Sequence, residues 1–406
     1  MKYVAVLGYG TVGSGVVEVL QENHAIIEKN AGDAIKVKYV VDIRDFEGEM
    51  FVKDFAIVEA DPDISVVVET IGGINPAFDF TKRALRAGKS VVTSNKELVA
   101  THGAELLALA KENNANYLFE ASVGGGIPII RPMCQCLAAN RIETICGILN
   151  GTTNYILTRM ICGGLTFERA LAEAQEKGYA ERNPAADVEG HDACRKICIL
   201  AALAFGKHVY PEYVATEGIT GITLEDVAYA GSNDMVIKLL GRAEMRDGKL
   251  YAFVGPHLVP RDNPLAGVEG VFNSIMVRGN AIGEAMFYGR GAGKLPTASA
   301  VVADVIDATK HLEARKFIDW EDGGADVVAD PKEFSAPRYV RIQGASVRSA
   351  ATQVFPELRF LENADAKADE CAFLTPSMSG YEIEEKLSDL SKISTVLAQM
   401  KVLTLE

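Results

Sequence analysis

Short apolar runs alternate with amphipathic stretches along the first third of the chain. The runs bounded by turn residues predict strands, and the stretches with apolar residues every three or four positions predict helices. Strands that alternate with helices form βαβ units, so the pattern predicts an α/β domain with a parallel sheet over residues 1–130. Strands are expected at 3–7, 35–43, 64–69, 90–93 and 117–121, with later helices at 77–87 and 97–112.

The pattern changes after residue 130. A group of helices comes first, and strands with no helix between them follow, which favours an antiparallel sheet. We expect a second, α+β domain over residues 131–320, whose last helix, 296–313, folds back onto the first domain. An acidic segment with two glycines and two prolines, 319–337, is typical of a linker. A small α+β domain over 338–406 should follow. The expected helices are 153–162, 166–177 and 187–205, and the expected strands are 251–259, 271–277 and 285–288.

The first apolar run ends directly in Gly8-Tyr9-Gly10-Thr11-Val12-Gly13. In such a motif the first glycine permits a tight turn, the second lets the backbone approach a pyrophosphate, and the third lets helix and strand pack closely. The phosphates then sit at the N-terminus of the following helix. We therefore expect a Rossmann-type domain in which residues Gly8, Gly10, Thr11, Val12 and Gly13 bind NAD or NADP. The alternative is a glycine turn that only packs a helix on the sheet.

The end of the second strand contains two candidates for choosing the cofactor. An acid at this place takes the ribose 2′-hydroxyl of NAD, whereas an arginine accommodates the 2′-phosphate of NADP. Asp42 could do the first and Arg44 the second. The sequence leaves the choice open, and we take NADP as the first candidate. A surface turn with a local ion pair is the alternative for each residue.

Composition excludes several classes of protein. The formal net charge of -14 argues against a nucleic-acid partner, because phosphate binding needs clustered Lys and Arg. The chain has no long uncharged apolar stretch and no signal peptide, so we expect a cytoplasmic protein that does not cross a membrane. An odd number of cysteines at irregular spacing favours neither disulfides nor a zinc site. They are Cys134, Cys136, Cys146, Cys162, Cys194, Cys198 and Cys371.

Four segments place polar residues or glycines at strand and helix ends, where open α/β sheets bind ligands. They are 92–97, 120–128, 149–154 and 178–196. In the last segment Asp192 and Lys196 are i,i+4 neighbours on one helix face. By itself this pair is typical of a helix-surface ion pair worth about 0.3–0.5 kcal/mol. The polar residues and glycines of the other three segments weaken this interpretation and favour a catalytic role for the pair.

Several motifs, in order, resemble homoserine dehydrogenase. The resemblance spans about residues 1–315, and separated motifs in the right order are far more specific than any one of them. The residues that carry it are Gly8-x-Gly10-x-x-Gly13, Ser94-Asn95-Lys96-Glu97, Glu120-Ala-Ser-Val-Gly-Gly-Gly-Ile-Pro128, Gly147-Ile-Leu-Asn-Gly-Thr-Thr-Asn-Tyr155, Gly178-Tyr-Ala-Glu181, Asp187-x-x-Gly190-x-Asp192-x-x-Arg195-Lys196 and Gly289-x-Gly291-Ala-Gly293-x-x-Pro-Thr297.

This resemblance implies the NAD(P)H-dependent reduction of L-aspartate 4-semialdehyde to L-homoserine, on the path to threonine, isoleucine and methionine. Hydride addition puts negative charge on the aldehyde oxygen, which must be stabilised and protonated. Lys196 is the expected acid, directly or through water, because a partly desolvated lysine has a lowered pKa. Asp192 should hold Lys196 and keep it charged. Lys96, otherwise a surface lysine at a helix start, should lie between nicotinamide and substrate.

The resemblance also assigns the remaining ligands. Glu181, assisted by Asp187, should bind the substrate ammonium group, although either could be a solvated loop acid. Residues Gly151 and Thr152 should bind its carboxylate, and Gly293 should touch the cofactor. A monovalent cation, sodium, should be held by Glu120, Val123, Gly125 and Ile127, since carbonyl oxygens and a carboxylate suit a hard cation.

The match loosens in residues 338–406. Many family members end in an ACT regulatory domain, and the strand order here fits an ACT-like fold. The turn after its first strand reads Gln343-Gly-Ala-Ser-Val-Arg348, without the usual acid and proline, so regulation by threonine stays open beside a packing or oligomerisation role. The family implies a homodimer or homotetramer. Another amino-acid dehydrogenase, or a nucleotide-sensing protein without turnover, are the alternative functions.

Overall fold

The computed structural model describes residues 1–314 and 318–404. Residues 315–317 and 405–406, which belong to the second and third expected domains, lie outside the described residues. Contacts divide the chain into two compact units. The first unit contains residues 1–143, 198–213 and 276–327, and the second contains 144–197, 214–275 and 328–406.

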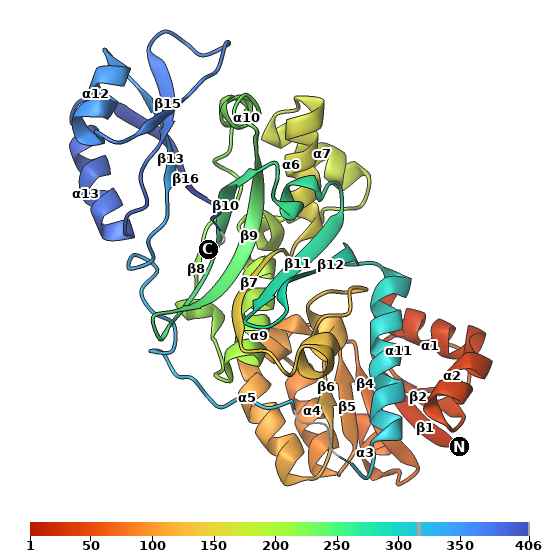
Figure 1. The fold of residues 1–406 in the computed structure, drawn as a ribbon. Coiled ribbons are helices and arrows are strands. Elements are labelled where there is room, and N and C mark those ends of the chain that lie inside the picture. The colour runs from red at the N-terminus through yellow and green to blue at the C-terminus, as the bar shows by residue number, and fades with distance from the viewer. Residues whose placement is uncertain (315–317, 405–406) are drawn as a thin grey trace. The chain divides into compact units, whose positions relative to one another are not determined.

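A six-stranded sheet forms the centre of the first unit (Figure 1). Its order is β3-β2-β1-β4-β5-β6, and all of its neighbouring strands run parallel. The strands are apolar on both faces because helices cover a parallel sheet on each side; the consecutive residues Val6 and Leu7 of β1, and Val67 and Val68 of β4, are all fully buried. The Rossmann-type parallel sheet predicted from the sequence is therefore confirmed. Its elements are β1 (Lys2–Leu7), α1 (Thr11–Glu22), α2 (His24–Ala31), β2 (Ile35–Val41), β3 (Phe51–Val52), α3 (Phe55–Ala60), β4 (Ile64–Glu69), α4 (Ala77–Arg86), β5 (Ser90–Thr93), α5 (Lys96–Glu112) and β6 (Tyr117–Leu118).

A helix from far along the chain completes the first unit. Helix α11 (Lys294–Lys310) lies beside α1 and α2 (Figure 1). Gly15 of α1 makes the close approach possible, since a Cβ there would lie 3.1 Å from the Cβ of Ala298. Val301, Val305 and neighbouring residues of α11 share one apolar core with β1 and β4.

The second sheet has ten strands, in the order β12-β11-β7-β9-β10-β16-β13-β15-β14, with β8 paired to β10. It is mixed, because β9 and β10 are antiparallel while β10 and β16 are parallel. Elements along this part of the chain are the short helices η1 (Glu120–Ser122), η2 (Pro132–Cys136), η3 (Pro211–Tyr213) and η4 (Pro264–Gly267), the helices α6 (Gly151–Gly163), α7 (Phe167–Glu176), α8 (Ala185–Val188), α9 (His191–Phe205) and α10 (Leu224–Gly231), and the strands β7 (Ile142–Ile148), β8 (Ala215–Thr216), β9 (Met235–Arg246), β10 (Lys249–Pro260), β11 (Phe272–Gly279) and β12 (Gly283–Arg290).

The last part of the chain folds as a βαββαβ unit, an arrangement found in split βαβ folds. Helices α12 and α13 share an apolar core with β13 and β15. The elements are β13 (Arg338–Gln343), α12 (Val347–Val354), β14 (Arg359–Leu361), β15 (Glu370–Leu374), α13 (Gly380–Leu390) and β16 (Thr395–Val402).

Charged groups tie this βαββαβ unit to α10 within the second unit. The Asp226 carboxylate, fully buried, accepts hydrogen bonds from Arg341 Nε and from the Tyr339 hydroxyl, each at 2.8 Å. Strand β16 also pairs with β10 through Lys401 and His257. Residues 338–406 lie in the second unit and share a sheet with the strands before them. Among the described residues, no helix is long and apolar enough to span a membrane.

Candidate active site

The glycine loop has the geometry that its sequence predicts. Gly8 follows β1 with a φ of +88°, a conformation that side chains disfavour. A Cβ on Gly13 would lie 1.9 Å from the carbonyl oxygen of Gly8, so the turn closes only with glycine there. Gly10 has nothing within 4 Å of a hypothetical Cβ and directly precedes α1, where Thr11 and Val12 begin the helix. The loop therefore presents open backbone at a helix N-terminus, which suits a pyrophosphate.

Asp42 and Arg44 form a hydrogen-bonded ion pair at the end of β2. The Asp42 carboxylate accepts the backbone N–H of Tyr9 at 2.7 Å and the backbone N–H of Arg44 at 2.9 Å. The Arg44 guanidinium donates to both of its oxygens. This guanidinium and the backbone bonds hold the pKa of Asp42 well below its usual range. Tyr9 also packs edge-on against Phe46 and Phe51, an aromatic cluster that sequence reasoning missed.

Lys96 is the first residue of α5, directly after the capping residue Asn95, whose side chain accepts the N–H of Leu98 at 3.1 Å. A second residue, Glu69, fixes this turn from β4. Its carboxylate is fully buried and accepts the Thr93 hydroxyl at 2.6 Å and the Ile71 N–H at 2.7 Å. Burial raises the pKa of Glu69. The acid at the end of an otherwise apolar strand, Val-Val-Val-Glu69, was the available sequence signal for this role.

In the second unit, Lys196 and Asp192 lie one turn apart on α9 and are both buried, 7% and 4% exposed. Lys196 Nζ donates to Asp192 Oδ2 at 2.8 Å and to the Leu149 carbonyl at 2.8 Å. This is no solvated helix-surface pair. Burying an ion pair costs desolvation energy, and removing one partner of the pair strongly destabilises the fold. A buried pair is therefore weak evidence for a stabilising role.

The segment between β7 and α6 closes around this pair. Asn150 caps α6 and donates from Nδ2 to Asp192 Oδ2 at 2.9 Å and to Asp187 Oδ1 at 2.7 Å. Burial, and then the nearby Asp192 carboxylate, raise the pKa of Asp187, while the Asn150 amide opposes the rise. The structure therefore brings Asp187, Asp192 and Lys196 together through a residue to which the sequence assigned no such role.

The other substrate-site candidates lie next to this cluster along the chain. Gly151 and Thr152 begin α6, and the Thr152 hydroxyl donates to the Tyr179 carbonyl at 2.7 Å. A Cβ on Gly151 would lie 2.7 Å from the Val271 carbonyl oxygen. The Glu181 side chain is exposed on the loop after Tyr179. In the first unit, Gly293 precedes α11 with a φ of +126°.

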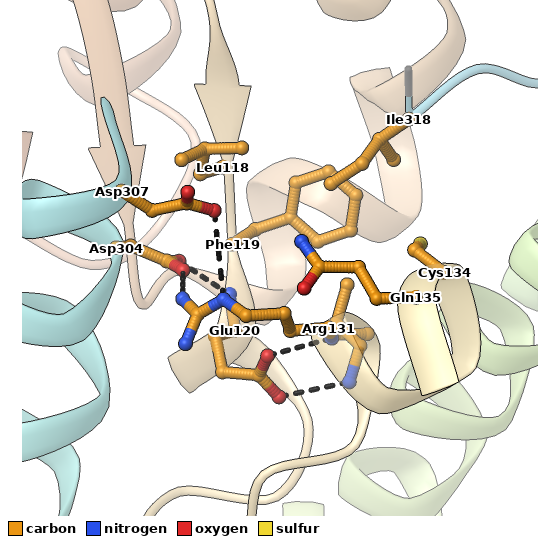
Figure 2. A pocket seen from close by; sticks show the side chains of 10 residues that line it. Leu118, Phe119, Glu120, Arg131, Cys134, Gln135, Asp304, Asp307 and Ile318 are labelled. Atoms are coloured by element: carbon orange, nitrogen blue, oxygen red, sulfur yellow. Dashed lines mark hydrogen bonds and ion pairs between the residues drawn. The ribbon is translucent and has the colours of Figure 1, made fainter. Parts of the chain in front are cut away.

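The Glu120 carboxylate, which was expected to bind a cation, accepts hydrogen bonds from backbone N–H groups. It is 3% exposed, and its two carboxylate oxygens accept the backbone N–H groups of Ile129, Ile130 and Arg131 at 2.6–2.8 Å. Figure 2 shows this carboxylate turned toward the backbone of Arg131, while the Arg131 side chain reaches the carboxylates of Asp304 and Asp307. Burial raises the pKa of Asp304 to about 7 although Arg131 opposes it. These groups line a cavity of about 160 Å³.

The loop after Glu120 contains the other three residues of the expected cation site. Val123 and Ile127 are buried in it, and Gly125 takes a φ of +57°. A Cβ on Gly125 would lie 2.3 Å from the Gly291 carbonyl oxygen. Among the described residues no cluster of His, Cys, Asp and Glu side chains suits a metal ion, and all seven cysteines are free thiols.

The comparisons with known proteins agree with this arrangement. Two family models match the chain: one described as homoserine dehydrogenase over residues 128–306, and one described as homoserine dehydrogenase, NAD binding domain, over residues 8–120. The homoserine dehydrogenase of Synechocystis is 46% identical over 316 residues, which cover 75% of this chain and 72% of the relative. That of Bacillus subtilis is 44% identical, with 76% and 73% covered.

Solved structures of homoserine dehydrogenases have a similar fold. A homoserine dehydrogenase from Thiobacillus denitrificans superposes with a TM-score of 0.89 at 35% identity, covering 99% of this chain and 98% of that one. A hyperthermophilic archaeal homoserine dehydrogenase in complex with NADPH has a TM-score of 0.66 at 31% identity and covers 76% of this chain and 98% of that one. The chain belongs to the homoserine dehydrogenase family, NAD(P)-dependent oxidoreductases that act on a CH–OH group.

Proposed function

We propose a division of roles among the residues of this member of the homoserine dehydrogenase family. The family reaction is the reduction of L-aspartate 4-semialdehyde to L-homoserine with a nicotinamide cofactor. When bound, that cofactor supplies the hydride. The chain must bind the aldehyde, stabilise the charge on its oxygen and deliver one proton. The observation that carries our assignment is the buried Lys196–Asp192 pair on α9.

Lys196 is our candidate for the proton donor. Its ammonium can donate to the developing alkoxide and so stabilise the charge that appears in the transition state. Asp192 keeps the ammonium oriented through the 2.8 Å contact. In homoserine oxidation the neutral amine takes the hydroxyl proton. Whether Lys196 acts directly or through one water is tested by solvent isotope effects in the wild type.

Lys96 is our candidate for the second catalytic lysine. It begins α5 at the carboxyl end of β5, the edge at which open parallel sheets bind ligands. The Glu69–Thr93–Asn95 contacts fix the turn before it. Gly8, Gly10, Thr11, Val12, Gly13 and Gly293 are proposed as the further cofactor contacts.

For the cofactor we propose NADP in preference to NAD. The Asp42 carboxylate already accepts hydrogen bonds from Tyr9 and Arg44, so its capacity for a ribose 2′-hydroxyl is partly used. The Arg44 side chain is 56% exposed and supplies a planar guanidinium that suits a phosphate.

For the substrate we propose that Glu181 binds the α-ammonium group, with Asp187 assisting. The start of α6, at Gly151 and Thr152, would hold the carboxylate, because backbone N–H groups at a helix N-terminus favour an anion. The exposed position of Glu181 fits a residue that meets its partner only when substrate is present.

For the loop at residues 120–127 we propose a sodium site made from the backbone carbonyls of Glu120, Val123, Gly125 and Ile127. A hard, weakly bound cation accepts carbonyl oxygens as ligands. Its role would be to fix the glycine loop rather than to take part in the chemistry.

For residues 338–406 we propose an ACT-like module that serves regulation or oligomerisation, in a homodimer or homotetramer. The βαββαβ order of β13 to β16 supports it. We place the protein in the cytoplasm on its composition. Light scattering tests the assembly, and initial rates with and without threonine test the regulation.

The deciding experiment for the function measures nicotinamide absorbance. Purified chain should consume NADPH with aspartate semialdehyde and reduce NADP with L-homoserine. Turnover with neither NADP nor NAD would refute an active enzyme and leave the nucleotide-sensing alternative. Turnover with L-aspartate instead of homoserine would favour the other amino-acid dehydrogenase.

A further inference from the structure

We infer that Asn150 is a positioning residue that holds Asp187 and Asp192 in register with Lys196. The inference rests on the catalytic roles proposed above for Lys196 and Asp192. It starts from one contact set: Asn150 Nδ2 donates to Asp187 Oδ1 at 2.7 Å and to Asp192 Oδ2 at 2.9 Å. One amide nitrogen therefore joins an acid on α8 to an acid on α9.

The orientation of the Asn150 amide is fixed from its other side. Its oxygen Oδ1 accepts the backbone N–H of Thr153 at 2.9 Å and the Thr153 hydroxyl at 3.0 Å. A flipped amide would set its NH2 group against the Thr153 N–H and its oxygen against two carboxylates. The orientation with NH2 toward the acids avoids both clashes and gives each acid a hydrogen bond from Asn150. Asn150 is 5% exposed, so water does not substitute readily for these bonds.

Two consecutive residues then hold the two members of the ion pair. The Leu149 carbonyl accepts one N–H of the Lys196 ammonium, and the Asn150 amide donates to the Asp192 carboxylate. Asp192 Oδ2 accepts another ammonium N–H. These two hydrogen bonds fix the orientation of the ammonium.

Asparagine suits this place for electrostatic reasons. Two carboxylates close together repel each other, and the Asp192 charge is one cause of the raised pKa of Asp187. The NH2 group of Asn150 supplies one N–H to each acid and adds no charge that would compete with Lys196. An aspartate in its place would put a third carboxylate against the other two.

The capping role and the positioning role of Asn150 can be separated by substitution. Asn150→Asp and Asn150→Ser both keep an oxygen that caps α6, since Asp, Ser and Asn are similar caps. Both remove the NH2 group that joins the acids. Asn263→Asp is the matched control, because Asn263 Oδ1 caps η4 by accepting the Leu265 N–H at 2.9 Å.

We expect kcat for homoserine oxidation to fall by about 10- to 100-fold in both Asn150 variants, the cost of a small misplacement of reacting groups. The KM for homoserine should change less than kcat, and the dissociation constant of NADP should stay within about twofold. Asn263→Asp should keep the kcat of the wild type. Melting temperatures of all variants check the fold.

A wild-type kcat in either Asn150 variant would overturn the inference, and so would a defect confined to the KM for homoserine. If Asn150→Ser melts early, Asn150→Asp alone decides, because its side chain is closer in size to asparagine. Lys196→Ala distinguishes a failure of the positioning role of Asn150 from a failure of the proposed catalytic role of Lys196. Active Asn150 variants beside an inactive Lys196→Ala reject the positioning role only, whereas an active Lys196→Ala rejects the catalytic roles themselves.

Discussion

The guanidinium of Arg44 lies against both carboxylate oxygens of Asp42, with Nε 3.0 Å from Oδ1 and Nη2 2.8 Å from Oδ2. The same carboxylate accepts the N–H of Tyr9 in the glycine loop. The pair therefore joins the end of β2 to the loop that precedes α1. If NADP is the cofactor, as proposed above, its 2′-phosphate would compete with Asp42 for the guanidinium.

Replacing Arg44 with Gln should shift the cofactor preference toward NAD. A hydrogen bond to a charged group contributes about 1.5–3 kcal/mol, so the KM for NADP should rise by at least tenfold. The KM for NAD should stay nearly constant or fall, because Asp42 becomes more available. Initial rates with homoserine and each cofactor measure the change.

Arg86→Gln provides the control for a lost positive charge, since Arg86 lies exposed at the end of α4. It should leave both KM values unchanged. An equal rise for NADP and NAD in Arg44→Gln would show that Arg44 shapes the loop and does not read the 2′-phosphate.

Removing the Lys196 amine should abolish proton transfer. General acid–base catalysis contributes typically about 10²–10⁴-fold, and kcat of Lys196→Ala should fall within or beyond that range. Lys196→Arg should remain impaired, because a guanidinium keeps its proton at any working pH. Stopped-flow absorbance of NADPH formation measures both variants, and fluorescence titration should show unchanged NADPH affinity.

The exposed Lys392 on the turn after α13 is the matched lysine, and Lys392→Ala should keep full activity. Recovery of activity in Lys196→Ala by added primary amines would support the missing group as the cause. Wild-type turnover in Lys196→Arg would contradict a proton-transfer role, since only the charge would then matter.

Glu120→Gln should destabilise the first unit whether or not sodium is present. The carboxylate accepts three backbone N–H groups, and a glutamine would set its own NH2 group against some of them. Leaving a buried donor unsatisfied costs about 1–3 kcal/mol. Urea unfolding in sodium and in tetramethylammonium buffers measures the loss. The exposed Glu385→Gln is the control, and a loss seen only with sodium would make the carboxylate a cation ligand.

Lys401→Met should raise stability most at low pH. Burial, followed by the positive charge of Arg338, lowers the pKa of Lys401 to about 7 from its ordinary 10.5. Below the folded value the ammonium stays charged at the full cost of burial. Between the two values the folded chain binds fewer protons than the unfolded chain, so wild-type stability rises with pH. The advantage of the methionine variant should therefore shrink as the pH rises from about 7 to about 10.5.

Thermal unfolding at several pH values measures this trend, with Lys392→Met as the exposed control. The groups that surround Lys401 are Arg338, Arg242 and His257 on neighbouring strands, with Glu217 opposing them. A constant difference between Lys401→Met and the wild type across the range would mean that the lysine stays charged throughout.

The parallel sheet could be predicted because its strands carry the signal in their own residues. Apolar runs such as 64–69 and the glycine loop at residues 8–13 are local features, and β4 and α1 begin where these features place them. The family motifs likewise identified Lys196 and Asp192. Their burial could not be read from an i,i+4 spacing, which is the same for an exposed pair.

Two features escaped prediction because they depend on distant partners. Strand β9 is almost wholly buried yet carries Lys238, Arg242 and Glu244, which break the apolar pattern. Arg242 is neutralised by Glu244 two residues on, and Lys238 donates to the Val268 carbonyl. The bridge made by Asn150 depends on α8 and α9 converging on one amide, which no local pattern encodes.

A shorter catalytic fragment without residues 338–406 would lose contacts within the second sheet. A cut before Arg338 removes the guanidinium and the phenol that bind the Asp226 carboxylate, and leaves that acid with the Thr223 backbone N–H and hydroxyl of its own helix cap. It also strips β16 from β10 and leaves the backbone of β10 unpaired at His257 and Leu258, and an unpaired strand edge can template aggregation. A soluble fragment would therefore need this part of the β10 edge blocked by added charge.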